Sequence, residues 1–197
     1  MRGQRMIIAT TTDRGTDEDS ESASRVTRSI ADNYLRRPSV EDRAIHALST
    51  MANNDLSMMG LNGDEPPLCD AAFVFVNRKQ ARFLVSGGAA AYHFAGGKLA
   101  HRSLPGEASI IGMGPRYTPR LEPGFELKKE ENAFLTASPS FARAVSDEAV
   151  GEALRASSTP EEWMDRLQEL AGHDVQFCAI TAFLPLGKPK FLGILRK

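Results

Sequence analysis

The sequence predicts an α/β (α+β) layered sandwich, in which two mostly antiparallel β-sheets are flanked by helix pairs. Three observations support this fold class. The expected elements follow the order strand, two helices, several strands, two helices and final strands. Short turns separate the central strands, which favours antiparallel hairpins. Residues 71–76 are apolar throughout, which is typical of a strand that is covered on both faces.

The N-terminal part of the chain predicts one strand and two helices. Residues 6–9 form a short apolar run that we interpret as a strand. Apolar residues then recur three or four apart, which predicts a helix over 20–36 that ends before Pro38. Ser39 is the expected cap of a second helix over 40–56.

The middle of the chain predicts hairpin-connected strands. Residues 57–70 are rich in Gly, Asn, Asp and Pro and are interpreted as a loop. The strand at 71–76 is followed by an alternating strand at 81–85. Tyr92 and Phe94 precede the pair Gly96-Gly97, which is a strong hairpin signal. Two further strands are expected, at 109–111 and 133–137.

The C-terminal part predicts two helices and two strands. Ser146 is the expected cap of a helix over 146–156. Thr159-Pro160-Glu161-Glu162 is a capping box that begins a helix over 160–171, and Gly172 ends it. Trp163 in this helix is expected to be half-buried in the core, and a partner anchor is the alternative interpretation. The expected final strands span 175–184 and 191–195.

Composition limits the classes of partner and compartment. With 197 residues, 42% of them hydrophobic, the chain is expected to form one globular domain over 1–197. It has 24 basic and 25 acidic residues, so nothing favours a nucleic-acid partner. No apolar run approaches the roughly 20 residues of a membrane span. We expect a cytoplasmic protein in which Cys69 and Cys178 are buried thiols.

Local sequence words, in a shared order, resemble the type 2C metal-dependent serine/threonine protein phosphatases, including the sporulation stage II E-type enzymes. The family places Asp-Gly-x-Gly-Gly after its first central strand, a Gly-Asp-Ser-Arg-Ala-Tyr hairpin in the middle, and a Ser-Asp-Gly strand end before a helix that begins Ser-Asp-Glu. Its last motif is Asp-Asn-x-Thr. The corresponding segments here are residues 7–15 (IIATTTDRG), 87–92 (GGAAAY), 133–140 (AFLTASPS), 146–148 (SDE) and 174–177 (DVQF).

The resemblance implies a phosphatase-like domain that departs from the family at its metal-binding positions. The family's N-terminal hairpin has no counterpart in the sequence, and the flap is shortened to a loop around 103–120. Gly88 stands where the family has the hairpin aspartate, and Pro139 replaces the aspartate of the Ser-Asp-Gly segment. Type 2C enzymes bind two divalent ions, Mn²⁺ or Mg²⁺, through oxygen ligands from several strand ends. Only Asp13 and Asp174 remain at matching positions.

These departures leave two functional hypotheses open. Asp13 and Asp174 are either a residual metal pair, expected to lie close together, or ordinary loop and turn aspartates. Gly87-Gly88 is either a backbone anion site or a closely packed strand end. The first hypothesis is a pseudophosphatase that needs no cofactor and binds or regulates a protein partner, such as a phosphoprotein or a component of a kinase pathway. The alternative is a divergent, active Mn²⁺- or Mg²⁺-dependent phosphoserine/phosphothreonine phosphatase.

Overall fold

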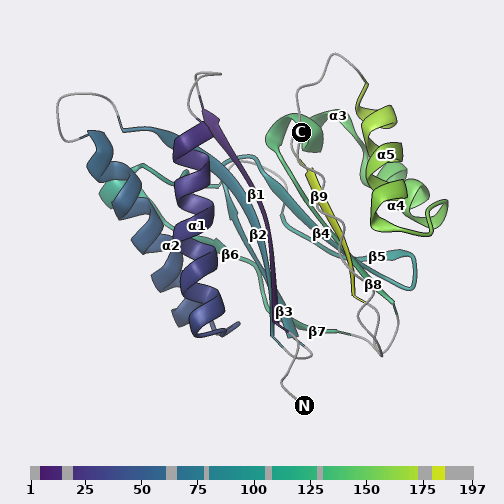
Figure 1. Cartoon of the computed structure of the whole chain (residues 1–197), viewed down its shortest axis with the longest axis horizontal. Coiled ribbons are helices and arrows are strands. Elements are labelled where there is room, and N and C mark those ends of the chain that lie inside the picture. Colours follow the sequence, from purple (N-terminus) through teal and green to yellow (C-terminus); the bar gives the residue numbers. More distant parts are fainter. Residues whose placement is uncertain are drawn as a thin grey trace.

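The computed structural model describes residues 5–14, 20–60, 66–77, 80–104, 108–127, 131–172 and 179–184. Two antiparallel β-sheets face each other at the centre of the molecule, and helices cover the outer face of each sheet (Figure 1). This arrangement confirms the predicted layered sandwich with helices on both sides.

The first sheet, sheet A, is built on one long antiparallel run of three strands. In spatial order these strands are β1 (Arg5–Arg14), β2 (Leu68–Asn77) and β3 (Gln80–Ser86). Two short strands, β6 (Arg120–Leu121) and β7 (Phe125–Glu126), extend the sheet beyond β3. The β2 strand is buried along almost its whole length, as its apolar sequence predicts.

The second sheet, sheet B, has four strands in the order β5 (Lys98–Arg102), β4 (Ala90–Ala95), β8 (Asn132–Ala137) and β9 (Ala179–Leu184). The predicted hairpin turn at Gly96-Gly97 joins β4 to β5. All neighbouring strands of sheet B are antiparallel.

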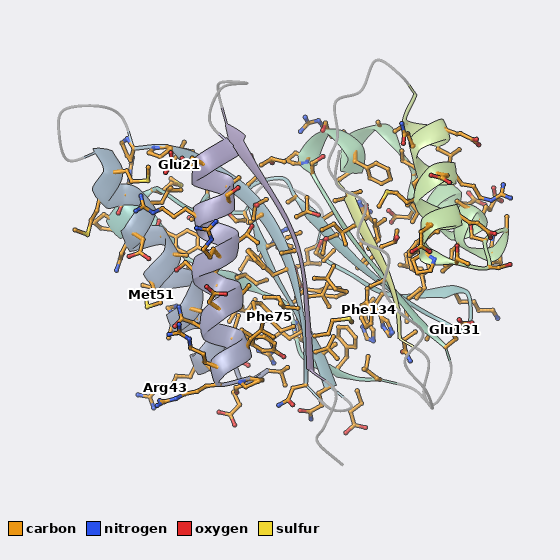
Figure 2. All side chains as sticks on the ribbon, in the orientation of Figure 1. Glu21, Arg43, Met51, Phe75, Glu131 and Phe134 are labelled. Carbon is orange, nitrogen blue, oxygen red and sulfur yellow. The ribbon has the colours of Figure 1, made fainter. Side chains whose placement is uncertain are left out.

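Helices α1 (Ser20–Arg36) and α2 (Asp42–Ser57) cover sheet A. Sheet B is covered by α3 (Pro139–Ala144), α4 (Asp147–Arg155) and α5 (Pro160–Ala171). Successive side chains of a strand point to opposite faces of its sheet, so the core is divided into three layers. One layer lies between the sheets, and one lies under the helices on each side. Phe134 belongs to the layer between the sheets, whereas Phe75 belongs to the layer under α1 and α2 (Figure 2).

The helix caps agree with the sequence at three of four predicted positions. Ser146 accepts the N–H of Ala149, Thr159 accepts the N–H of Glu162, and Gly172 ends α5. The prediction that Ser39 caps α2 is wrong, because the N-cap residue is Glu41. Ser39 Oγ only accepts the N–H of Glu41, at 3.2 Å. Glu41 instead has the extended backbone conformation that precedes the first turn of the helix.

Other differences concern strand boundaries and burial. The segment 109–111 is not a strand, because only Ile111 pairs with sheet A, through a single bridge to Cys69. The strand predicted at 71–76 begins earlier, at Leu68, and α3 was not predicted. Trp163 is fully buried rather than half-buried, and its indole N–H donates to the carbonyl of Val150 at 3.2 Å.

Three predicted features fall outside the described residues: the start of the strand at 175–184, the strand at 191–195, and Cys178. Cys69 is buried as expected, and its thiol lies 3.4 Å from the carbonyl oxygen of Asp70. Among the helices that the structure describes, none combines the length and the apolar character that crossing a membrane requires.

Candidate functional site

The candidate site lies at one end of the sandwich, where strand ends from both sheets come together. The start of β2, the turn between β3 and β4, and the junction of β8 with α3 meet there. Two contacts establish this convergence. The N–H of Gly88 donates to Oδ1 of Asp70 at 2.8 Å, and Gly88 also packs against Pro139.

The contact between Gly88 and Pro139 fills the position where the sequence resemblance places two carboxylates. A Cβ atom added to Gly88 would lie 3.2 Å from the Cβ atom of Pro139, closer than ordinary van der Waals contact. It would also lie 4.0 Å from Nη1 of Arg143 on α3. The two replacements are therefore sterically matched, because a side chain at position 88 would require Pro139 to shift by a few tenths of an ångström. This geometry supports the close-packing interpretation of Gly88 over an anion site.

Asp70 is the functional candidate that sequence reasoning missed. Its side chain is 3% exposed, and its carboxylate faces the turn that contains Gly88. The sequence pattern predicts a loop at Asp70, because the residues before it are rich in turn-forming types. The available signal was its position directly before an apolar run, since a carboxylate at the start of a buried strand needs hydrogen-bond donors.

The structure places Asp13 near the end of β1, where its register partner on β2 is Cys69 and where Thr12 pairs with Asp70. The two aspartates therefore occupy adjacent register positions on neighbouring strands. Asp174 lies outside the described residues, so the predicted closeness of Asp13 and Asp174 stays a prediction.

Polar side chains behind the site join the two sheets. The hydroxyls of Thr10 on β1 and Thr136 on β8 lie 2.8 Å apart, and Thr10 also donates to the carbonyl of Thr136. Beyond β8, the hydroxyls of Ser138 and Ser140 are 3.0 Å apart. The contacts between Thr10 and Thr136 fix β1 relative to β8 in a buried environment, where hydrogen bonds are strongest.

Residues 108–117 belong to the chain segment that connects β5 of sheet B to β6 of sheet A. Asn53 of α2 holds this segment beside the site. The buried side chain of Asn53 accepts the N–H of Gly112 and donates to the carbonyl of Gly114, both at 3.0 Å. Gly112 has φ +108°, and a Cβ atom there would lie 2.2 Å from the carbonyl oxygen of Pro67. Only glycine fits this position, because both the backbone conformation and the space exclude a side chain.

Tyr92 is fully buried and Tyr117 is partly buried, and the pKa of each is raised. Burial raises the pKa of Tyr92, an effect that the nearby positive charge of Arg102 partly opposes and Asp147 reinforces. Arg102 lies over the Tyr92 ring at 5.3 Å and donates to Asp147 at 2.6 Å. Burial also raises the pKa of Tyr117, and the neighbouring side chain of Ser49 lowers it by less. Both phenols remain neutral near neutral pH.

The described residues at the site do not fit a pair of divalent ions. Hard cations of this kind need several oxygen ligands that converge on one point. The converging side chains here are one carboxylate, which already accepts a backbone N–H, and the apolar ring of Pro139. Within the described ranges, no group of three or more His, Cys, Asp and Glu side chains could hold a metal.

Solved structures with the same architecture are protein phosphatases. The catalytic domain of the serine/threonine phosphatase PstP, in complex with two manganese ions, superposes with a TM-score of 0.75 at 16% identity over 90% of this chain and 87% of that one. The fold is that of the type 2C phosphatases. PppA from Pseudomonas aeruginosa, a key regulatory component of T6SS, gives a TM-score of 0.68 at 13% identity over 90% and 86% of the two chains.

A third relative by fold is the serine/threonine phosphatase MsPP from Mycobacterium smegmatis, in complex with cacodylate. Its TM-score is 0.69 at 12% identity over 89% of this chain and 86% of that chain. No protein-family model and no curated protein sequence matches this chain. At these identities the likeness establishes the type 2C phosphatase fold, and it leaves activity to be argued from the site.

Proposed function

We propose that this protein is a pseudophosphatase: a type 2C-fold module that acts by binding a protein partner and not by metal-dependent hydrolysis. The observation that carries the proposal is the contact of Gly88 with Pro139. Two positions that the resemblance assigns to carboxylates hold instead a glycine and a proline in close packing. Proline offers only a backbone carbonyl as a ligand, so the anionic part of a dinuclear metal shell is lost at both places.

The proposal is strengthened by how well the replacements fit the fold. The strands, helix caps and buried layers keep their apolar packing and hydrogen bonds, so the fold does not depend on carboxylates at positions 88 and 139. Loss of residues that merely support a metal ligand costs roughly 10–100-fold in affinity or activity, so loss of ligands should cost more. A partner protein, such as a phosphoprotein, would then be bound without being turned over.

The test combines metal binding with hydrolysis. Calorimetric titration of Mn²⁺ into the purified protein should show no saturable binding in the millimolar range, and a phosphoserine peptide should not be hydrolysed above background. The variant carrying both Gly88→Asp and Pro139→Asp should gain Mn²⁺ binding, because it returns two carboxylates and removes the ring that obstructs the first. The matched control carries Gly88→Ala and Pro139→Ala, which opens the same space without adding a carboxylate.

The alternative is a divergent but active Mn²⁺- or Mg²⁺-dependent phosphatase. One observation favours it: a buried carboxylate, Asp70, lies at the site, and Asp13 occupies a neighbouring register position. Hydrolysis by the unmodified protein at an ordinary enzyme rate, about 1 s⁻¹ or more, would establish this alternative if Asp174→Ala or Asp70→Asn abolished it. Activity that survives both substitutions would indicate a contaminating phosphatase.

A further inference from the structure

The outer edge of β1 is a long strand edge that no other strand of the described residues covers. β1 is the terminal strand of sheet A, and among the described residues its only partner strand is β2. Residues 6–12 of this strand contain no charged residue and no proline. Native edge strands are normally short or carry charges that prevent pairing with another chain. An edge of this kind favours pairing with a further strand.

A terminal strand of sheet B, β5, has that protection. β5 is only five residues long, is largely exposed, and carries Lys98, His101 and Arg102. The contrast between β5 and β1 indicates that the edge of β1 is adapted for contact, whereas the edge of β5 is adapted for solvent.

The helix beside this edge also presents apolar surface. Ser29 of α1 donates to Asp55 of α2 at 3.3 Å, whereas Thr27 lies 2.6 Å from Thr11 of β1. Positions two apart on a helix point in nearly opposite directions, so one flank of α1 faces α2 and the other lies on the β1 side. Ala31 and Leu35 follow Thr27 at four-residue spacing on this second flank, and Leu35 is 51% exposed.

We propose that β1 pairs with β1 of a second copy of this chain, antiparallel and with Ala9 opposite Ala9, so that sheet A continues across a two-fold axis. In this register Ile8 lies opposite Thr10 of the second copy and Ile7 lies opposite Thr11. The last pair sets Arg5 opposite Asp13, so opposite charges coincide at both ends of the shared ladder.

Other registers fit less well. In β1, Met6, Ile8 and Thr10 belong to the face between the sheets, whereas Ile7, Ala9 and Thr11 contact the helix layer. A shift by one residue would therefore set the interior face of one copy against the helix face of the other. A register with Thr10 opposite Thr10 would keep the two faces matched. It would, however, set Met6 opposite Arg14 and lose the pairing of Arg5 with Asp13.

Small residues let the two helices approach in this dimer. Thr27 and Ala31 lie on the flank of α1 that would face α1 of the second copy, and packed helix axes are about 8–10 Å apart, nearer where side chains are small. Leu35 on the same flank would be covered by the second copy. The dimer thus accounts for an exposed large apolar side chain as well as for a strand edge that no described strand covers.

The oligomeric state tests this interface. Sedimentation equilibrium should show a dimer at micromolar concentration, and Ala31→Arg and Leu35→Arg should each shift the protein to monomer with unchanged near-ultraviolet circular dichroism. Leu170→Arg is the matched control, because Leu170 is 49% exposed on α5 and lies outside the proposed interface. A monomeric unmodified protein, or a dimer that persists in both α1 variants, would overturn the proposal.

Cysteine cross-linking tests the register independently. Residues that face each other in an antiparallel pair have Cα atoms about 4.5–5.5 Å apart, within the disulfide range of about 4.4–6.8 Å. Ala9→Cys should therefore form a disulfide-linked dimer on mild oxidation. Ile7→Cys should not, because two residues at position 7 would be offset by about 13 Å along the strands. Equal cross-linking of the two variants, or of neither in a dimeric protein, would contradict the proposed register.

Discussion

Asn53 fixes a segment that has little regular structure of its own. Its amide joins α2 to Gly112 and Gly114, both of which lie in the buried part of the loop before β6. Removing the amide would leave both of these buried backbone groups without their side-chain partner. A buried polar group without a partner costs about 1–3 kcal/mol, so a single side chain here stabilises the loop beside the candidate site.

Replacing Asn53 by alanine should therefore lower the free energy of unfolding by about 2–4 kcal/mol, since it leaves two buried backbone groups unsatisfied. Urea denaturation measures this change. Arg43→Ala on the same helix is the control, because Arg43 is exposed, and its effect should stay within about 0.5 kcal/mol. Equal effects of the two substitutions would show that the amide contacts contribute little.

Tyr92 and Tyr117 make stability depend on pH in the alkaline range. Burial raises the pKa of Tyr92 and of Tyr117 in the folded state above the value of about 10 that the unfolded chain has. The folded state thus holds these protons more tightly than the unfolded state. Their contribution to stability is fully present below pH 10 and is lost as the pH rises above it.

We expect the melting temperature to fall more steeply between about pH 9.5 and 11 than between pH 8 and 9.5, because the tyrosine pKa of the unfolded chain lies near 10. The variant with Tyr92→Phe and Tyr117→Phe should lose less stability over the same range. Thermal melts across this pH series measure both. A double variant with the same pH dependence as the unmodified protein would assign the alkaline loss to other groups.

At the scale of elements, α2 and α5 are both preceded by a residue of a type that often caps helices, but only the residue before α5 is a cap. Thr159 accepts the N–H of Glu162 at 3.1 Å, and Glu162 in turn accepts the N–H of Ser158 at 2.7 Å. Ser39 has the right residue type and precedes a helix, but it lies two residues before the actual N-cap, Glu41. Residue type alone does not distinguish the two situations, since a cap also requires the correct backbone position.

Thr159→Ala should destabilise the protein by about 1 kcal/mol, because it removes the side-chain acceptor at the start of α5. Ser39→Ala should change stability by less than about 0.5 kcal/mol, because Ser39 is partly exposed and does not cap the helix. Chemical denaturation of the two variants provides a direct comparison. The order of the two effects is the informative result, and a reversal would contradict the assigned cap of α5.

The sequence predicts most elements well because their signals are local. Apolar periodicity and caps located α1, α4 and α5 to within about two residues, the usual uncertainty of helix ends. The β2 strand was predicted too short, because Cys69 and Asp70 follow a run of turn-forming residues. The site was less accessible, since the contact of Gly88 with Pro139 joins positions 51 apart in the sequence and depends on tertiary packing.

At the scale of the whole molecule, the proposed loss of metal binding predicts how stability responds to divalent ions. A metal that binds only the folded state at about 100 times its Kd adds about 2.7 kcal/mol, which would raise the melting temperature of a chain of this size by roughly 5–10 °C. We expect no such rise with millimolar Mn²⁺, and no fall with EDTA. A shift of that size, abolished by Asp70→Asn, would contradict the pseudophosphatase proposal.

The single tryptophan gives the molecule a built-in optical reporter of one of its layers. Trp163 is fully buried between α5 and sheet B, with its ring edge against Phe94 at 5.6 Å. Its fluorescence therefore responds to loosening of the helix layer on sheet B, whereas far-ultraviolet circular dichroism averages over both sheets and all helices. Comparing the two transitions shows whether the layer on sheet B separates before the sandwich melts or whether the layers unfold as one cooperative unit.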